Sequence, residues 1–183
     1  MRRTLFAVPA ALLALAALAA APSAGQSQAS RAAVSGAWGY AGAPADGEAI
    51  VRAAVEPVVL RMRPDIQAAA RERIGESTWL PTRIRIGGAG GRVEVALEGR
   101  ERRRFATRPG QVLQVPLRSG QYAQLVQSVR PDGAVEQRFQ ALEGVQTNVY
   151  RLGADGAMQL DVTLASSMFA EDIRFTLAYR RAR

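Results

Sequence analysis

Carboxylates are the only side chains in this sequence that can act as a general acid or base, because it contains no histidine, cysteine or lysine. All 24 basic residues are arginines. The chain therefore has no imidazole base, no thiolate nucleophile, no lysine for a Schiff base or a Ser-Lys pair, and no usual ligand set for zinc, copper or haem. We therefore expect no catalytic residues, no metal and no cofactor. The alternative, an enzyme that works through two carboxylates, is not indicated by any spacing in the sequence.

The most distinctive acidic residues have structural interpretations. Asp132 and Asp155 each precede a glycine, a pattern typical of a turn in which aspartate hydrogen-bonds its own backbone. Glu171 and Asp172 form an adjacent acidic pair, which we expect in a solvated loop, with a weak calcium site as the alternative. These carboxylates predict turns and loops.

Positive charge is concentrated in one short segment of a chain whose formal net charge is +8. The arginines of this segment are Arg100, Arg102, Arg103, Arg104 and Arg108. We expect them on an exposed hairpin, where they could contact anionic lipid, lipopolysaccharide or the acidic group of a ligand. Nucleic acid is not an expected partner, since aromatic residues do not interleave with these arginines, apart from Phe105.

The N-terminus has the pattern of a secretory signal peptide. Arg2 and Arg3 precede an apolar run from Leu5 to Ala21, and small residues follow it. A membrane anchor and a buried helix are the alternatives, but the run is shorter than the roughly 20 apolar residues that span a bilayer. We expect a signal peptide over residues 1–25, with cleavage after Ser23 or Gly25, and a flexible stretch over 26–33. The mature protein is then expected to be periplasmic or secreted, monomeric and not transmembrane.

The segment from Leu80 to Arg181 predicts a series of short antiparallel strands. Glycine-containing turns recur in it roughly every 8 to 12 residues, as in consecutive hairpins. Strands are expected near 80–86, 92–98, 101–107, 111–117, 121–130, 134–142, 145–152, 157–164 and 172–181. Such a meander can close on itself as a barrel, and without cysteine it depends on its core alone for stability.

A short strand and two helices are expected before this series. The strand covers 34–40, and the helical segment extends over about 46–75. Asp46 is the expected N-cap of the first helix, Pro57 is expected to kink or end it near Glu56, and Pro64 is expected to begin the second.

One strand, a helix-turn-helix and nine further strands resembles the fatty-acid-binding protein family of the calycin superfamily. Gly36-Ala37-Trp38 is similar to the G-x-W signature of calycin first strands. The resemblance implies an all-β domain over 34–183, a ten-stranded antiparallel up-and-down β-barrel with a helical lid between strands 1 and 2. It also implies an R-x-Y pair in the last strand that holds a ligand carboxylate. Tyr179 matches the Tyr, but Leu177 stands where the Arg would be, so that pair is incomplete.

The strand patterns suggest a lumen with polar as well as apolar groups. Uncharged amides fall on both faces of the middle strands, and amides are tolerated better around a hydrated cavity than in a packed core. The residues expected to contact a ligand are Phe139, Tyr150, Phe175 and Tyr179, Met62 of the lid, and Arg151 or Arg174 if either turns inward. For each of these the alternative is an ordinary core or surface position.

The resemblance further implies that Trp38 closes the base of the barrel beneath an arginine of the last strand, here Arg174 or Arg180, with Gly36 as part of the same structural motif. The predicted function is that of an exported protein that binds a small lipophilic or amphipathic ligand non-covalently in the lumen. The alternative is an envelope interaction protein with a filled barrel, which contacts anionic lipid, lipopolysaccharide or a partner protein through its arginine-rich surface. An open lumen would favour the first interpretation and a packed one the second.

Overall fold

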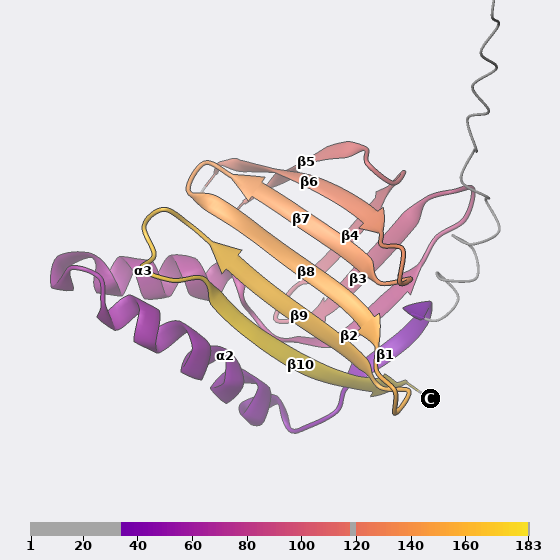
Figure 1. Cartoon of the computed structure of the whole chain (residues 1–183), viewed down its shortest axis with the longest axis horizontal. Coiled ribbons are helices and arrows are strands. Elements are labelled where there is room, and N and C mark those ends of the chain that lie inside the picture. The colour runs from indigo at the N-terminus through magenta and orange to yellow at the C-terminus, as the bar shows by residue number, and fades with distance from the viewer. Residues whose placement is uncertain (1–33, 118–119, 183) are drawn as a thin grey trace, which may run out of the picture.

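The computed structural model describes residues 34–117 and 120–182, so the signal peptide and the flexible stretch expected over 1–33 lie outside the described residues. Within this part of the chain one strand, two helices and nine further strands follow one another in the predicted order (Figure 1). The elements are β1 (Gly36–Tyr40), α2 (Pro44–Leu60), α3 (Pro64–Ser77), β2 (Pro81–Gly87), β3 (Val93–Gly99), β4 (Arg102–Thr107), β5 (Val112–Pro116), β6 (Tyr122–Val129), β7 (Val135–Ala141), β8 (Gly144–Leu152), β9 (Met158–Ala165) and β10 (Ile173–Arg181).

The ten described strands form a single antiparallel sheet in the order β4-β3-β2-β1-β10-β9-β8-β7-β6-β5. Strands that follow one another in sequence pair with each other, except β4 and β5, which are the two free edges of the sheet. In addition, β1 pairs with β10. The sheet therefore curls into a nearly closed up-and-down barrel, as predicted (Figure 1). The predicted strand ends differ from the observed ones by two residues at most.

The strict alternation of apolar and polar residues in β9 and β10 explains why these two strands form one wall of the core. Leu160 and Val162 of β9 lie opposite Leu177 and Phe175 of β10, and all four side chains are buried. The residues between them point to solvent. Alternating apolar and polar residues thus give this sheet one dry and one wet face.

The two predicted helices are present between β1 and β2, but the start of the first differs from the expectation. Ala43 is the N-cap of α2, Pro44 opens the helix, and Asp46 lies in the first turn without a side-chain cap. Proline suits the first turn because its missing N–H would have no helical partner there. Figure 1 shows α2 beside β10. Neither described helix combines the length and the apolar character needed to cross a bilayer.

Pro57 was predicted to kink or end the first helix, and it does not end it. The helix continues from Pro57 to Leu60, and Val58 and Val59 in this last turn are 3% and 0% exposed. Burial of two valines offsets the lost backbone hydrogen bond, since each buried valine contributes about 1.5 to 3 kcal/mol.

A chain of buried polar side chains crosses the interior of the barrel. The Tyr150 hydroxyl donates to Gln137 Oε1 at 2.7 Å, and Gln137 Nε2 donates to Gln127 Oε1 at 2.9 Å. Gln127 Nε2 in turn donates to Thr107 Oγ1 at 3.0 Å and to the Val93 carbonyl at 3.1 Å. Because these bonds run from β8 through β7 and β6 to β4 and β3, side chains connect the two halves of the barrel across the unpaired β4–β5 edge.

Trp38 is fully buried at the base of the barrel, and its indole Nε1 donates to the Val34 carbonyl at 3.0 Å. The arginine above its ring is Arg181, whose guanidinium carbon lies 4.7 Å from the ring centroid. The prediction of Arg174 or Arg180 for this position is wrong. Both lie on the face of β10 that points to solvent, whereas Arg181 is aligned with Trp38 in the β1–β10 register.

Gly36 lies at the edge of the same contact. Its φ is 135°, and a β-carbon at this position would collide with Nη1 of Arg181. A side chain here would therefore be strained and would displace the cation from Trp38.

Gln127→Ala should lower the free energy of unfolding by about 2 to 4 kcal/mol, because it removes one hydrogen bond from each of three buried partners, on β3, β4 and β7. Gln124→Ala is the matched control on the same strand, since Gln124 is exposed. This substitution should change the free energy of unfolding by less than about 0.5 kcal/mol. Urea unfolding measures both. Equal effects of the two substitutions would contradict the structural role of Gln127.

Candidate functional site

A cavity of about 420 Å³ lies between α3 and the inner face of the barrel, at the end where the lid covers it. This volume lies within the range of about 300 to 1,000 Å³ that is usual for small-molecule sites. Its apolar wall is made by lid residues on one side and by inward-facing strand residues on the other. These include Ile66, Ala70 and Ile74 from α3, and Leu97, Phe105, Ala123, Phe139 and Leu164 from the strands.

Two phenylalanines bridge the open edge of the sheet inside this cavity. Phe105 of β4 and Phe139 of β7 meet edge to face, with ring centroids 5.5 Å apart and an interplanar angle of 72°. Such pairs contribute about 0.5 to 1.5 kcal/mol beyond their burial. They give the cavity a fixed aromatic surface next to the gap between β4 and β5.

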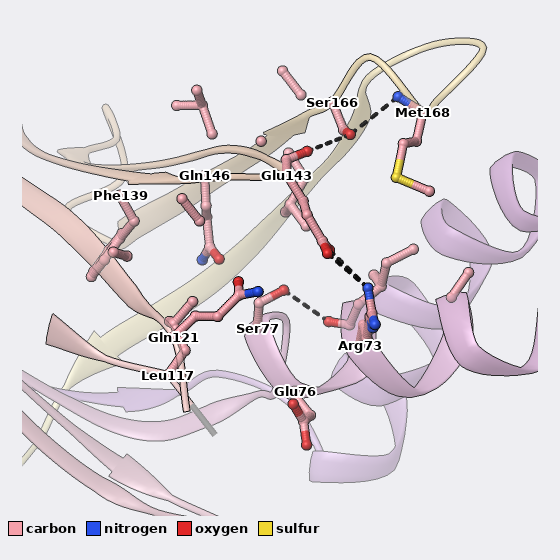
Figure 2. Close-up of a pocket in the computed structure, with 18 of the residues that line it drawn as sticks. Arg73, Glu76, Ser77, Leu117, Gln121, Phe139, Glu143, Gln146, Ser166 and Met168 are labelled. Atoms are coloured by element: carbon pink, nitrogen blue, oxygen red, sulfur yellow. Dashed lines mark hydrogen bonds and ion pairs between the residues drawn. The ribbon is translucent and has the colours of Figure 1, made fainter. Parts of the chain in front are cut away.

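Uncharged amides form a polar strip along one side of the cavity. Gln146 Nε2 donates to Asn148 Oδ1 at 2.9 Å, and both residues line the cavity together with Gln121. Figure 2 shows Gln121 and Gln146 pointing into the space between the strands and α3. Amides offer both donors and acceptors, so this strip can hydrogen-bond an uncharged polar group of a ligand.

Ion pairs fasten the lid to the strand connections at the mouth. Arg73 of α3 donates to Glu143 in the β7–β8 turn at 2.8 Å, and Arg61, after α2, pairs with Glu171 in the β9–β10 loop at 2.9 Å. The Ser166 hydroxyl donates to the Glu143 carbonyl at 2.6 Å, which holds the two connections together (Figure 2). These pairs are exposed, and exposed pairs contribute only about 0 to 1 kcal/mol, so the lid is held weakly at this edge.

Arg103 lines the cavity, which the sequence did not predict. It alternates with exposed Arg102 and Arg104 on β4 and lies on the same inward face as Phe105. Its guanidinium Nε donates to Glu101 Oε2 at 2.9 Å, and its side chain is only 24% exposed. The alternation of Arg103 with buried Phe105 was the signal that could have revealed this orientation.

The five arginines expected on one exposed hairpin thus have different surroundings. Arg103 faces inward, and Arg104 pairs with Glu94 at 2.7 Å. Arg100 and Arg102 lie at the lid end of the barrel, whereas Arg108 lies in the β4–β5 connection at the opposite end. Only part of the expected surface is therefore a continuous positive patch.

Of the residues predicted to contact a ligand, Met62 and Phe139 line the cavity. Tyr150, Phe175 and Tyr179 are instead packed in the core and do not line it. Burial raises the pKa of Tyr150 well above the usual phenol range, against a smaller opposing effect of its hydrogen bond with Asn148.

Tyr179 serves the core rather than a ligand carboxylate. Its hydroxyl donates to the Pro81 carbonyl at 2.9 Å, and its ring meets Tyr40 edge to face at 5.7 Å. Burial raises the pKa of Tyr179 strongly, with smaller contributions from Tyr150 and Tyr40.

Arg151 and Arg174 do not point inward. Arg151 pairs with Asp161 of β9 on the outer face, and Arg174 pairs with Asp172 at 2.8 Å. Strand alternation places both on the solvent side, because Tyr150 and Ile173 next to them are buried. The charge that they were expected to bring into the lumen comes instead from Arg103 and Arg73.

A ten-stranded barrel with two helices between its first strands and a cavity beneath them is the fold of the fatty-acid-binding proteins, within the calycin folds. Among solved structures, the Schistosoma mansoni fatty acid binding protein in complex with arachidonic acid is similar at a TM-score of 0.55 and 13% identity, over 84% of this chain and 99% of that chain. The REP1-NXSQ fatty acid transporter is similar at a TM-score of 0.53 and 13% identity, over 83% of this chain and 98% of that chain. Apo Caenorhabditis elegans lipid binding protein 8 is similar at a TM-score of 0.54 and 10% identity, over 82% of this chain and 96% of that chain. No family model and no curated protein sequence matches the chain.

The Asp161 carboxylate should make stability depend on pH in a defined direction. Burial alone would raise its pKa, but hydrogen bonds from Arg151 and Thr176 outweigh burial, so the pKa lies below its usual value. A carboxyl whose pKa is lower in the folded state stabilises the fold above its unfolded pKa and loses this contribution as the pH falls through the folded value. Asp161→Asn should therefore be less stable than the wild type at neutral pH, and the difference should shrink in acid.

Urea unfolding of both proteins at several pH values measures this difference. Arg151→Met is the companion variant, since it leaves the carboxylate but removes one cause of the lowered pKa, and its stability should vary less with acid than that of the wild type. A difference between wild type and Asp161→Asn that is the same at all pH values would contradict the prediction.

Proposed function

We propose that this protein binds a small lipophilic or amphipathic molecule non-covalently in the cavity beneath α3. The observation that carries the proposal is the cavity itself, which has apolar walls, an aromatic pair and a strip of amides at the lid end of the barrel. Each of these groups binds rather than reacts, since lipophilic ligands are held by buried apolar surface and oriented by a few hydrogen bonds. The similar structures, described as fatty acid or lipid binding proteins, support this interpretation.

Access to the cavity is proposed at the mouth between the lid and the strand connections. The two ion pairs at this edge, Arg73–Glu143 and Arg61–Glu171, are exposed and weak, so they can separate at little cost. Exposed Leu142 and Met168 lie in the same two connections and would meet an apolar molecule on its way in.

An envelope interaction protein with a filled barrel remains the less well supported alternative. The base of the barrel is filled by the Gln127 and Gln137 amides, but the lid end holds the cavity. The arginines that would form its contact surface are divided between the interior, the outer face of β4 and the two ends of the barrel, so these described residues do not form one compact patch.

Export is part of the proposal, and the pattern of residues 1–25 supports it. The full-length chain, expressed in a double-membraned bacterium, should accumulate in the periplasm without its first residues. Intact-mass measurement of the periplasmic and cytoplasmic fractions tests this, with a chain that begins at Ser27 as the control that should stay in the cytoplasm. An uncleaved full-length chain in the cytoplasm would contradict export but would leave the binding proposal untouched.

Ala70→Trp should abolish ligand binding, because Ala70 lines the cavity from α3 and an indole there would occupy much of it. Native mass spectrometry, after incubation with a panel of fatty acids, fatty amides, isoprenoid alcohols and lysophospholipids, should show a one-to-one complex for the wild type. Ala68→Trp, on the exposed face of the same helix, is the control and should bind as the wild type does. A wild-type chain that binds no member of the panel would refute the proposed function.

A further inference from the structure

The positive charges that line the cavity are already neutralised by the protein itself. Among the described lining residues the cations are Arg73 and Arg103. Arg73 is bound by Glu143 at 2.8 Å, and Arg103 is bound through both Nε and Nη2 by Glu101 Oε2 at 2.9 Å. A further carboxylate, Glu76, lines the cavity as well. The described residues that line the cavity therefore carry no excess positive charge.

The Glu101–Arg103 pair is built into the wall rather than added at its surface. Glu101 directly precedes β4, and its carboxylate binds the guanidinium of Arg103, the second residue of that strand, which lines the cavity. Their side chains are 21% and 24% exposed. Glu101 thus occupies the place on the guanidinium where the carboxylate of a ligand would otherwise bind.

At the opposite end of the lumen none of the described buried side chains is a cation, since Arg181 beside Trp38 is exposed. The buried polar groups there are the amides of Gln127 and Gln137 and the hydroxyls of Thr107 and Tyr150, which satisfy one another. Leu177, fully buried in β10, contributes only apolar surface. A carboxylate moved from water into this interior would lose its hydration without gaining a counter-ion, which is strongly unfavourable.

We propose that the Glu101–Arg103 pair makes the cavity select uncharged lipophiles, such as a fatty amide, alcohol or ester, over free fatty acids. This inference rests on the proposed function and names its ligand class. The apolar part of the ligand contacts the wall of α3 and the strands, and its neutral polar group exchanges hydrogen bonds with the Gln121, Gln146 and Asn148 amides. The fold is thus shared with fatty-acid-binding proteins, whereas the ligand chemistry differs.

Isothermal titration calorimetry with dodecanamide and dodecanoate at neutral pH tests the inference, since the two probes share their chain and differ in charge. The wild type should bind dodecanamide at least about tenfold more tightly, because a charged ligand group lacks a free partner. Glu101→Gln frees Arg103 and should raise the affinity for dodecanoate about tenfold, with little change for dodecanamide. That unchanged amide affinity shows that the variant is folded.

Two further variants assign the effect to the pair. Glu98→Gln removes an outward-facing carboxylate that lies 3.9 Å from Arg83, and it should bind both probes as the wild type does. The double variant Glu101→Gln with Arg103→Met should lose the gain in dodecanoate binding. A wild type that binds dodecanoate as tightly as dodecanamide, or a Glu101→Gln variant without the gain, would overturn the inference and leave the proposed function standing. No binding of either probe, or of any ligand in the panel above, would overturn both.

Discussion

Gln127 connects strands that the backbone leaves apart, and the rest of the barrel depends on this connection. The sheet ends at β4 on one side and β5 on the other, and these edges do not pair. Gln127 projects inward from β6 and donates to groups on β4 and β3, while its backbone carbonyl accepts a hydrogen bond from Gly110 in the β4–β5 connection at 2.9 Å. One residue therefore replaces part of the missing ladder. Because each buried polar group in its chain has a partner, the interior does not carry the cost of an unsatisfied amide.

This hydrogen-bonded chain also decides where a ligand can lie. Side chains that close the gap from inside must occupy the lumen, so the base is filled by amides and by Trp38, with the Arg181 guanidinium over the indole ring. The cavity lies toward the lid, where small residues such as Ala70 and Ala123 are among those that line it. The position of the cavity is thus a consequence of how the open edge is stabilised. The lid then needs only weak ion pairs at its rim, since the buried valines of α2 anchor it at the other side.

Local sequence signals were sufficient to predict the fold. Turn glycines and alternating strands were enough to predict all ten strands, because hairpin turns and half-buried sheets each have a short-range chemical pattern. The helix end that was considered at Pro57 is not observed, since the burial of Val58 and Val59 is a tertiary effect that helix propensity does not contain. The cavity residues were predicted less well for the same reason. Tyr150 and Phe139 both lie on inward faces, but which of them meets empty space depends on how the amides fill the base.

Arg103 illustrates why charge alone does not define a binding surface. A guanidinium in a half-buried wall needs a counter-ion in the empty protein as much as in the complex, because an unpaired buried charge costs several kcal/mol. A protein that relies on the ligand for that counter-ion is destabilised whenever the ligand is absent, whereas this chain supplies Glu101 from the same hairpin. The fixed pair stabilises the empty barrel, and it removes the electrostatic reason for a carboxylate to enter. Stability of the unliganded state and preference for an uncharged ligand therefore follow from the same two residues.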